Sequence, residues 1–265
     1  MWEGVDGETI ANSYSLYLVK DKNGKTHLSE ERSKVYQGII DTAFDGVEKP
    51  EHGKQEVVIM GGGGGSGKSY LIKSQYIQVA PQSAKKAVHI NPDDIKDGLP
   101  EYKQMLSSND ENVRKNAANF VQQESSIIAE RIYSLAVAKG YSVVYDGTGS
   151  DMKQMERFTS QARKSGAVVK AYYVQAPIDV ALKNAEKRYE TEGRYVDPAR
   201  LIEAHRKVSS NFEKMVEKGF FDETSLIQND REHPLTTIAT GKGKQLTVNN
   251  SEAYQSFMNK ATNSK

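Results

Sequence analysis

Residues 62–69 constrain the fold of this chain more than any other segment. They read Gly-Gly-Gly-Gly-Ser-Gly-Lys-Ser and match the phosphate-binding pattern G-x-x-x-x-G-K-[ST] at every fixed position. The apolar run 56–60 precedes them, and a segment with helical spacing follows from residue 69 to about 79. Because a strand, a glycine loop and a helix N-terminus together cradle phosphate oxygens, this context favours a phosphate site over a flexible glycine linker.

The loop also predicts how a nucleotide would be held. Its glycines let several backbone N–H groups point at phosphate oxygens. Lys68 can reach the β and γ phosphates, and the Ser69 hydroxyl can bind the magnesium ion that bridges them. We therefore expect ATP and Mg²⁺ as cofactors. The predicted ATP-binding residues are Gly62, Gly63, Gly64, Gly65, Ser66, Gly67, Lys68, Ser69 and Tyr70.

Short apolar runs alternate with helical segments along most of the chain. Further strands are predicted at 87–90, 141–145, 167–174 and 226–227, with helices over 112–138, 152–164, 179–189 and 199–218. This order, with the glycine loop after its first strand, indicates an α/β fold of the P-loop type, with a mostly parallel five-stranded sheet flanked by helices. We expect an N-terminal helical accessory arm over residues 1–54, a P-loop domain over 55–230, and a C-terminal hairpin and tail over 231–265.

The accessory arm carries one clear helix signal. Ser29 can cap a helix whose apolar side chains Val35, Ile39 and Ile40 form a stripe, and that helix should end before Gly46. Packing against the sheet is the ordinary role of such a stripe. A helix that acts in cis on the chain's own site and a docking segment are the alternatives.

Composition excludes several classes of protein. Thirty-six basic and 35 acidic residues leave a net charge of +1, which argues against a nucleic-acid partner. No run approaches the roughly 18 apolar residues of a membrane span, so no membrane association is expected. The chain has no cysteine, which excludes disulfides and thiolate chemistry. Residues 1–6 lack the pattern of a secretory signal, and we expect a cytoplasmic protein.

Carboxylates follow two of the predicted strands. Asp93 and Asp94 come after the strand at 87–90, and Asp146 comes after the strand at 141–145. Ligands of open α/β sheets bind at this edge, where a carboxylate can accept a hydroxyl proton or hold magnesium. The other interpretation is that Asp93 or Asp94 caps a helix that starts at Ile95.

Two arginines flank a glycine-containing break between the last two predicted helices. Arg188 and Arg194 stand where a mobile flap could bring positive charge to the γ phosphate. Surface salt bridges are the alternative, and they are the commoner fate of a single arginine.

At this point the residues resemble those of the zeta toxin family of P-loop kinases. The likeness covers about residues 57–228. It is carried in order by the P-loop, residues 90–96 (Ile-Asn-Pro-Asp-Asp-Ile-Lys), residues 140–149 with their Asp-Gly-Thr-Gly end, residues 187–191 (Lys-Arg-Tyr-Glu-Thr), residues 194–198 (Arg-Tyr-Val-Asp-Pro) and residues 218–222 (Lys-Gly-Phe-Phe-Asp).

The resemblance implies a kinase that uses ATP to phosphorylate the 3′-hydroxyl of the amino sugar in UDP-N-acetylglucosamine, acting as a toxin that an antitoxin restrains. It implies that Asp93 deprotonates this hydroxyl and that Lys68, Arg188 and Arg194 hold the phosphates. These four are the expected catalytic residues. Substrate contacts are expected from Asp93, Asp146, Thr148 and Lys153, and metal contacts from Ser69 and Asp146.

Two positions depart from the family pattern. Asp146 stands where the family often has glutamate, and Ser150 stands where it often has arginine, a cation that Lys153 could replace. Two alternatives stay open on sequence alone. One is a kinase of another nucleotide, dinucleotide or polynucleotide hydroxyl, and the other is a non-catalytic module that binds ATP or a partner.

Overall fold

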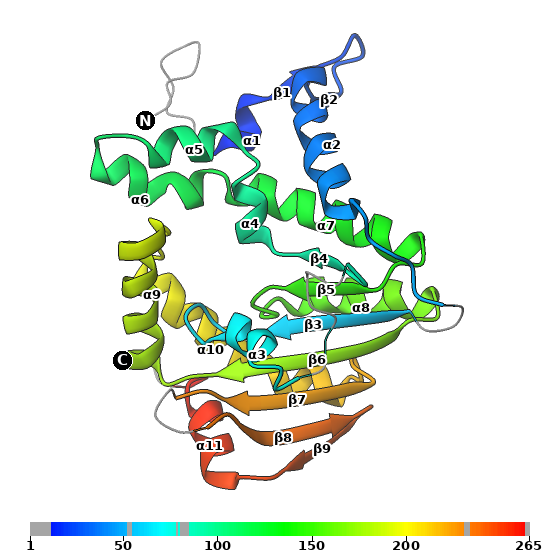
Figure 1. The fold of residues 1–265 in the computed structure, drawn as a ribbon, viewed down its shortest axis with the longest axis vertical. Coiled ribbons are helices and arrows are strands. Elements are labelled where there is room, and N and C mark those ends of the chain that lie inside the picture. Colours follow the sequence, from blue (N-terminus) through cyan, green and yellow to red (C-terminus); the bar gives the residue numbers. More distant parts are fainter. Residues whose placement is uncertain (1–11, 52–54, 78, 80–84, 231–233, 263–265) are drawn as a thin grey trace.

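The glycine loop follows β3 (Glu56–Gly61), the middle one of five parallel strands in the main sheet. In the computed structural model, β4 (Val88–Ile90), β5 (Val143–Asp146), β6 (Val168–Gln175) and β7 (Glu223–Gln228) lie in the same sheet (Figure 1). These five strands are parallel, in the order β4-β5-β3-β6-β7. The predicted parallel sheet is therefore confirmed.

The structure describes residues 12–51, 55–77, 79, 85–230 and 234–262.

The C-terminal hairpin extends the sheet. Strand β8 (Thr236–Lys242) pairs antiparallel with β7, and β9 (Gln245–Val248) pairs antiparallel with β8. The main sheet therefore has seven strands, two more than we expected, because the hairpin joins its edge instead of standing apart. The short helix α11 (Ser251–Asn259) follows.

Most of the expected helices are present. The segment 112–138 forms two consecutive helices, α6 (Glu111–Phe120) and α7 (Gln122–Ala138). Helix α8 (Met152–Lys164) has the predicted bounds, while α9 (Ile178–Glu192) runs three residues further than predicted. Helix α10 (Pro198–Glu217) lies within one residue of its predicted bounds.

Three helices differ from the sequence prediction. Helix α3 (Lys68–Lys73) stops well before residue 79, and Gln75 just beyond its end has a positive φ of 56° that interrupts helical geometry. Helices α4 (Pro92–Lys96) and α5 (Pro100–Leu106) were not predicted. Each begins with proline, whose fixed φ suits the first helical position.

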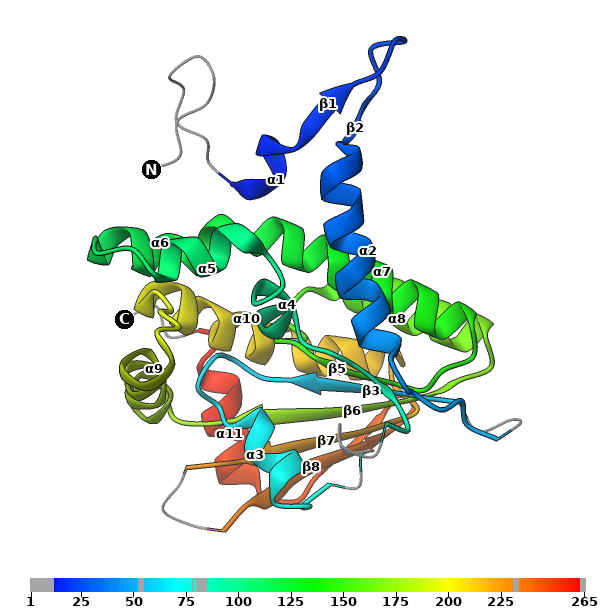
Figure 2. The ribbon, with the colours of Figure 1, turned by 45° about the horizontal axis from the view of Figure 1, so that its top comes forward.

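The two faces of the sheet belong to two apolar clusters. Val57 and Ile59 point into the larger cluster, which includes side chains of α7, α8 and α10. Val58 and Met60 point to the other face, where Leu71 of α3 packs. Because successive side chains of a strand alternate between faces, the continuously apolar β3 fits a sheet covered on both sides (Figure 2).

The N-terminal arm contains a helix α1 (Ser13–Leu16), a hairpin of β1 (Leu18–Lys20) and β2 (Thr26–Leu28), and the longer helix α2 (Glu30–Phe44). The arm was expected to be helical, so the hairpin is an addition.

The predicted cap and packing stripe of α2 are both present. Ser29 accepts a hydrogen bond from the Arg32 N–H. Tyr36 and Ile40 are buried in the larger cluster, and Val35 and Ile39 pack against it. The predicted domain bounds remain predictions.

A buried ionic cluster fastens this arm to α5 and α7. The Arg32 guanidinium, 2% exposed, donates to both carboxylate oxygens of Glu101 at 3.2 and 2.8 Å and to both of Glu124 at 2.8 and 2.5 Å. Glu124 also accepts from the hydroxyl of Tyr36 at 2.9 Å. Further bonds to the two carboxylates come from the Ser13 and Tyr17 hydroxyls.

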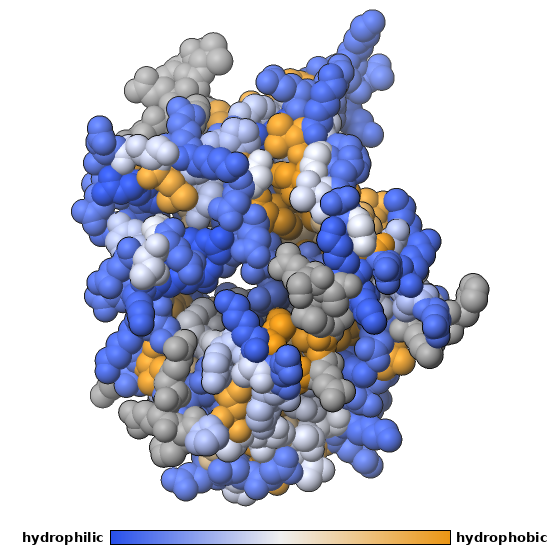
Figure 3. All heavy atoms as spheres, in the orientation of Figure 1, coloured by the Kyte–Doolittle hydropathy of each residue, from blue (hydrophilic) through white to orange (hydrophobic). Residues whose placement is uncertain are grey.

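The surface in Figure 3 is mostly hydrophilic, and hydrophobic residues gather there in small separate groups. Within the part of the chain that the structure describes, no helix combines the length and apolarity needed to cross a membrane.

Candidate functional site

The residues that the sequence singled out follow the carboxyl ends of neighbouring parallel strands. The glycine loop follows β3, Asp93 lies just beyond β4, and Asp146 ends β5, where it is in register with Met60 of β3. Asn229 follows β7 directly. Ligands of open parallel sheets bind at this edge, and here it brings the predicted phosphate site and the predicted acceptor carboxylates to neighbouring strands.

The glycine loop takes backbone angles that favour glycine at three of its positions. Gly62, Gly65 and Gly67 have φ values of 131°, 72° and 92°, which residues with a Cβ rarely adopt. The Lys68 ammonium donates to the carbonyl oxygens of Gly62 at 3.0 Å and Gly63 at 3.4 Å, so it lies over the loop.

Side chains from three other segments hold the outer carbonyls of this loop. Asn184 of α9 donates to Gly65 O at 2.8 Å, and Asn229 donates to Ser66 O at 2.9 Å. His205 of α10 lies 2.9 Å from Gly64 O through its Nε2. The carbonyl oxygens of Gly64, Gly65 and Ser66 are therefore all bound by side chains from outside the loop. We call Asn184, His205 and Asn229 the carbonyl clamp.

The structure around the loop leaves no room for a side chain at Gly63, Gly65 or Gly67. A Cβ on Gly63 would lie 2.1 Å from the His205 ring, and one on Gly67 would lie 2.0 Å from Nδ2 of Asn229. A Cβ on Gly65 would lie 2.2 Å from the carbonyl oxygen of Ala181 in α9. Glycine is therefore required here by close packing as well as by backbone geometry.

His205 is neutral in this position. Burial lowers its pKa to about 4, against the opposing effect of its hydrogen bond to Gly64. The neutral ring carries one N–H, and because a carbonyl oxygen only accepts, that proton is on Nε2. The sequence analysis did not identify any of the three clamp residues, which are ordinary helix and strand-end residues in the sequence.

We predict that His205→Ala weakens ATP binding about tenfold, because it frees the Gly64 carbonyl and loosens the loop. His205→Gln, which can still donate from its amide, should recover part of the affinity. Titration calorimetry with ATP and magnesium measures both. ATP affinity equal to wild type in the alanine variant would contradict the clamp's role, provided that both variants keep the wild-type circular dichroism spectrum.

On the acceptor side, the structure rules out one interpretation of Asp93 and Asp94. Asn91, not an aspartate, caps α4, since its side chain accepts from the Asp93 N–H at 2.9 Å. Both aspartates lie in the first turn, with their carboxylates free of capping. The alternative that either caps a helix starting at Ile95 is therefore wrong.

The Asp93 carboxylate lies between two cations. Lys96, whose side chain is 5% exposed, approaches it at 2.8 Å, and Nη2 of Arg188 lies 3.9 Å away. Burial alone would raise the pKa of Asp93, but Lys96, Arg188 and Arg194 together hold that pKa below its ordinary value. Asp93 is thus ionised at neutral pH. Lys96 is a further site residue that the sequence analysis missed, and only the unpredicted α4 places it one turn from Asp93.

The two arginines of the predicted flap, Arg188 and Arg194, each form an ion pair with an aspartate of α4. Arg194 pairs with Asp94 at 3.3 Å and Asp97 at 2.9 Å. Arg188 pairs with Glu192 at 3.0 Å as well as with Asp93. The segment that follows α9 is therefore fastened across the sheet edge to the helix that carries Asp93.

Asp146 and Thr148 lie beside the glycine loop. Burial raises the pKa of Asp146, and the nearby charge of Lys68 opposes this effect. The Thr148 carbonyl accepts from the Gly62 N–H at 2.8 Å, and its hydroxyl shares a 2.9 Å hydrogen bond with that of Ser150. The Asp-Gly-Thr-Gly segment and the phosphate loop are thus joined directly.

The remaining predicted residues are exposed and keep their roles as predictions. Ser69 and Tyr70 lie on α3, and Lys153 lies in the first turn of α8.

The glycine loop fits the polyphosphate of ATP. Ser66 Oγ is buried inside it, and none of the described residues hydrogen-bonds to this oxygen. A Cβ at Gly63, Gly65 or Gly67 would clash with neighbouring atoms, and Lys68 lies over the loop. Magnesium bound with ATP takes few protein ligands, and the Ser69 hydroxyl and Asp146 carboxylate are of the type it prefers.

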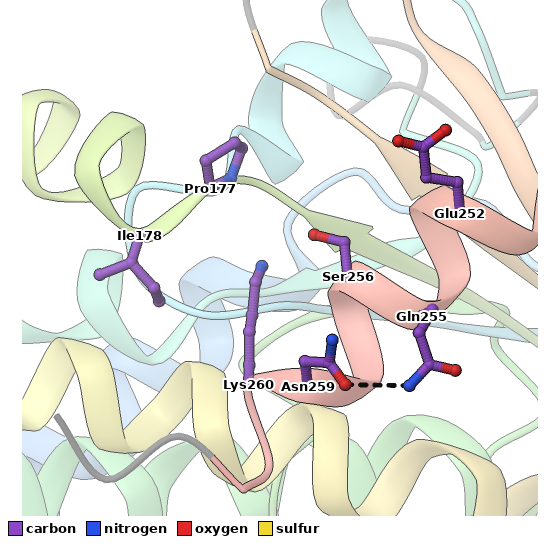
Figure 4. A pocket seen from close by; sticks show the side chains of 7 residues that line it. All are labelled: Pro177, Ile178, Glu252, Gln255, Ser256, Asn259 and Lys260. Atoms are coloured by element: carbon purple, nitrogen blue, oxygen red, sulfur yellow. Dashed lines mark hydrogen bonds between the residues drawn. The ribbon is translucent and has the colours of Figure 1, made fainter.

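Lys260, directly after α11, contacts the carboxyl end of β6. Lys260 donates to Oε1 of Gln175 at 2.6 Å and to the Ala176 carbonyl, and burial lowers its pKa to about 8. Figure 4 shows its side chain extending between Ile178 and Ser256 in the hollow beside α11. The Asn229 N–H donates to the Gln175 carbonyl. Lys260 therefore contacts the same residue that holds the backbone of the clamp residue Asn229.

Comparisons with known proteins bear on the family and the fold of this chain. The family model described as "Zeta toxin" matches residues 40–239. A search of curated proteins finds no match.

Solved structures show the same fold at low identity. A complex of AvrRxo1-ORF1 and AvrRxo1-ORF2 with ATP matches 97% of this chain and 84% of its own, with a TM-score of 0.73 and 16% identity. The same complex with sulphate ions matches 90% of this chain and 76% of its own, with a TM-score of 0.69 and 18% identity. A structure from the PezAT toxin-antitoxin system of Streptococcus pneumoniae matches 90% and 89%, with a TM-score of 0.64 and 14% identity.

Proposed function

The chain belongs to the zeta toxin family, and we propose that it is an ATP-dependent kinase that transfers the γ phosphate to a hydroxyl of a small acceptor. The acceptor we propose is UDP-N-acetylglucosamine, through the 3′-hydroxyl of its amino sugar. The observation that supports this most is the position of Asp93. Its ionised carboxylate, held by Lys96 and Arg188, lies at the same sheet edge as the phosphate loop.

In the proposed reaction the acceptor oxygen attacks the γ phosphorus, and the bond from that phosphorus to the bridging oxygen of ADP breaks. Asp93 accepts the hydroxyl proton. Because the pKa of Asp93 lies below its ordinary value, it is a weak base, and it orients the hydroxyl and takes the proton as the new bond forms. Transfer therefore does not require a free alkoxide.

Positive charge from the protein opposes the negative charge on the phosphoryl group. Lys68 would hold the β and γ phosphates, and Arg188 lies beside the base. Arg194 fastens the segment after α9 to α4 through Asp94 and Asp97, and its charge also acts on Asp93. Magnesium, when bound with ATP, neutralises further charge on the phosphates.

We also propose that an antitoxin protein restrains the activity. The solved structures of similar fold include AvrRxo1-ORF1 with AvrRxo1-ORF2 and a component of the PezAT toxin-antitoxin system. A partner that covers the glycine loop would keep ATP from the proposed site.

The experiment is mass spectrometry of small molecules after incubation of the purified protein with ATP and magnesium. UDP-N-acetylglucosamine and a metabolite extract are offered separately, and Lys68→Ala serves as the inactive control. We expect the UDP sugar to gain one phosphate with the wild type and none with the variant. A product formed from another metabolite would keep the kinase and overturn the acceptor. Absence of any phosphorylated product would contradict the kinase.

A further inference from the structure

The proposed reaction uses no residue of the N-terminal arm, yet helix α2 of that arm contacts the segment that carries Asp93. This segment runs from α4 through Gly98 to the first turn of α5. Both ribbon views place α4 beside α2 (Figure 1, Figure 2). Two side chains of α2, Ile39 and Arg32, hold the segment at two different places.

The first contact is between Ile39 and the backbone of Gly98. A Cβ on Gly98 would lie 2.8 Å from Cγ1 and 2.9 Å from Cδ1 of Ile39, so the isoleucine fills the space that a side chain there would need. The φ of Gly98 lies outside the left-handed region, and its backbone geometry therefore does not require glycine. Glycine at this position instead permits the close approach of α2.

The second contact is the ion pair between Arg32 and Glu101, which lies in the first turn of α5. The guanidinium donates to both carboxylate oxygens, at 3.2 and 2.8 Å, and the two side chains are only 2% and 4% exposed. A two-point pair of this kind fixes the orientation of both groups. The hydroxyl of Tyr17, also in the arm, donates to the same carboxylate. The start of α5 is thus held by two side chains of the arm.

Backbone hydrogen bonds join these contacts to the helix of Asp93. The Gly98 N–H donates to the Ile95 carbonyl at 3.0 Å, and the Leu99 N–H donates to the Lys96 carbonyl at 2.9 Å. The side chains of Ile95, Lys96 and Leu99 are buried. Because a close-packed interior transmits small displacements, a shift at Gly98 also shifts α4 and its aspartate.

We infer that the N-terminal arm positions the proposed base for phosphoryl transfer. Ile39 acts through Gly98, and Arg32 acts through Glu101. This inference rests on the proposed function and adds positioning residues that touch neither ATP nor the acceptor. Such residues control a rate because a displacement of about 1 Å in a reacting group costs about 10²-fold.

The test overfills the first contact and then relieves it. Gly98→Val adds three carbons where Ile39 lies, and Ile39→Ala removes three carbons from the same space. We expect Gly98→Val to slow single-turnover phosphoryl transfer to UDP-N-acetylglucosamine about tenfold or more. ATP should bind within about twofold of wild type, because the glycine loop follows a different strand. The double variant should recover most of the rate, which a general loss of stability would not do.

Gly38→Val is the matched control. It makes the same change in α2, at an exposed residue whose Cβ would meet no atom within 4 Å. We expect it to transfer phosphate as wild type does. A rate loss in this control equal to that of Gly98→Val would overturn the inference, as would a loss in Gly98→Val that Ile39→Ala does not relieve.

Hydrogen–deuterium exchange followed by mass spectrometry tests the same contact without turnover. Amides of residues 92–102 should exchange faster in Gly98→Val than in wild type, and the double variant should return to the wild-type rate. Unchanged exchange of these amides in Gly98→Val would overturn the inference. A wild type that transfers no phosphate would contradict the kinase, and the exchange rates would still decide whether the arm holds this segment.

Discussion

Asp93→Asn should slow phosphoryl transfer by about 10²–10⁴-fold while ATP binds as tightly as to the wild type. The amide keeps the size of the carboxylate but cannot accept the hydroxyl proton. The side chain lies on α4, outside the phosphate loop, so the nucleotide contacts remain. Single-turnover rates and titration of ATP measure the two effects separately.

Asp94→Asn is the matched control for that variant. It makes the same chemical change one residue away, on a side chain that pairs with Arg194 and not with Lys96. We expect its loss of rate to be at most about tenfold, since it concerns only an exposed salt bridge. Equal losses in the two variants would mean that Asp93 is not the base.

The pH dependence follows from the lowered pKa of Asp93. A base must be ionised to accept a proton, and here the pKa lies below the ordinary value of an aspartate. The rate should therefore be level through neutral pH and fall only at acid pH, below the range where an unperturbed carboxylate titrates.

Arg32→Met should lower the free energy of unfolding by about 3–5 kcal/mol. The substitution leaves the Glu101 and Glu124 side chains, 4% and 0% exposed, without the cation that neutralises them. Chemical denaturation followed by circular dichroism gives the free energy. Lys34→Met on the same helix is the control. It removes a cation whose exposed pair with Glu30 should contribute under about 1 kcal/mol to the free energy of unfolding.

The pH dependence of this loss tests its cause. In the wild type, burial would raise the pKa of Glu101, but the hydrogen bonds from Arg32 and Tyr17 hold it below the ordinary value. A carboxyl with a lowered pKa stabilises the fold above its unfolded pKa, and this contribution disappears as the pH falls through the folded pKa. The difference between wild type and Arg32→Met should therefore be constant through neutral pH and shrink only as the pH falls below the ordinary pKa of a glutamate carboxyl. A difference that stays constant with pH would assign the loss to packing.

Local patterns predicted much of this fold. The β-branched run before the glycine loop, the capped segment after Ser29 and the helical spacing over 152–164 each depend on neighbouring residues, and each is present. The hairpin was predicted, but its pairing with β7 was not, because an edge strand carries no local sign of the partner it will take.

The candidate site was predictable only where a motif stood in the sequence. The phosphate loop and the strand-end carboxylates were found from their spacing. The clamp residues Asn184, His205 and Asn229 lie 119, 141 and 163 residues from the carbonyls they hold, and no periodicity connects such distant positions. Lys96 was missed for another reason, since its pairing with Asp93 depends on a helix of five residues that is too short to show a period.

Two residues one turn apart on α9 contact two different parts of the candidate site. Asn184 holds the Gly65 carbonyl of the phosphate loop, and Arg188 reaches the Asp93 carboxylate. A single helix thus positions both a side chain that holds the glycine loop and the cation beside Asp93, the proposed base. A protein that displaced α9 would therefore disturb both contacts without binding at the ATP site.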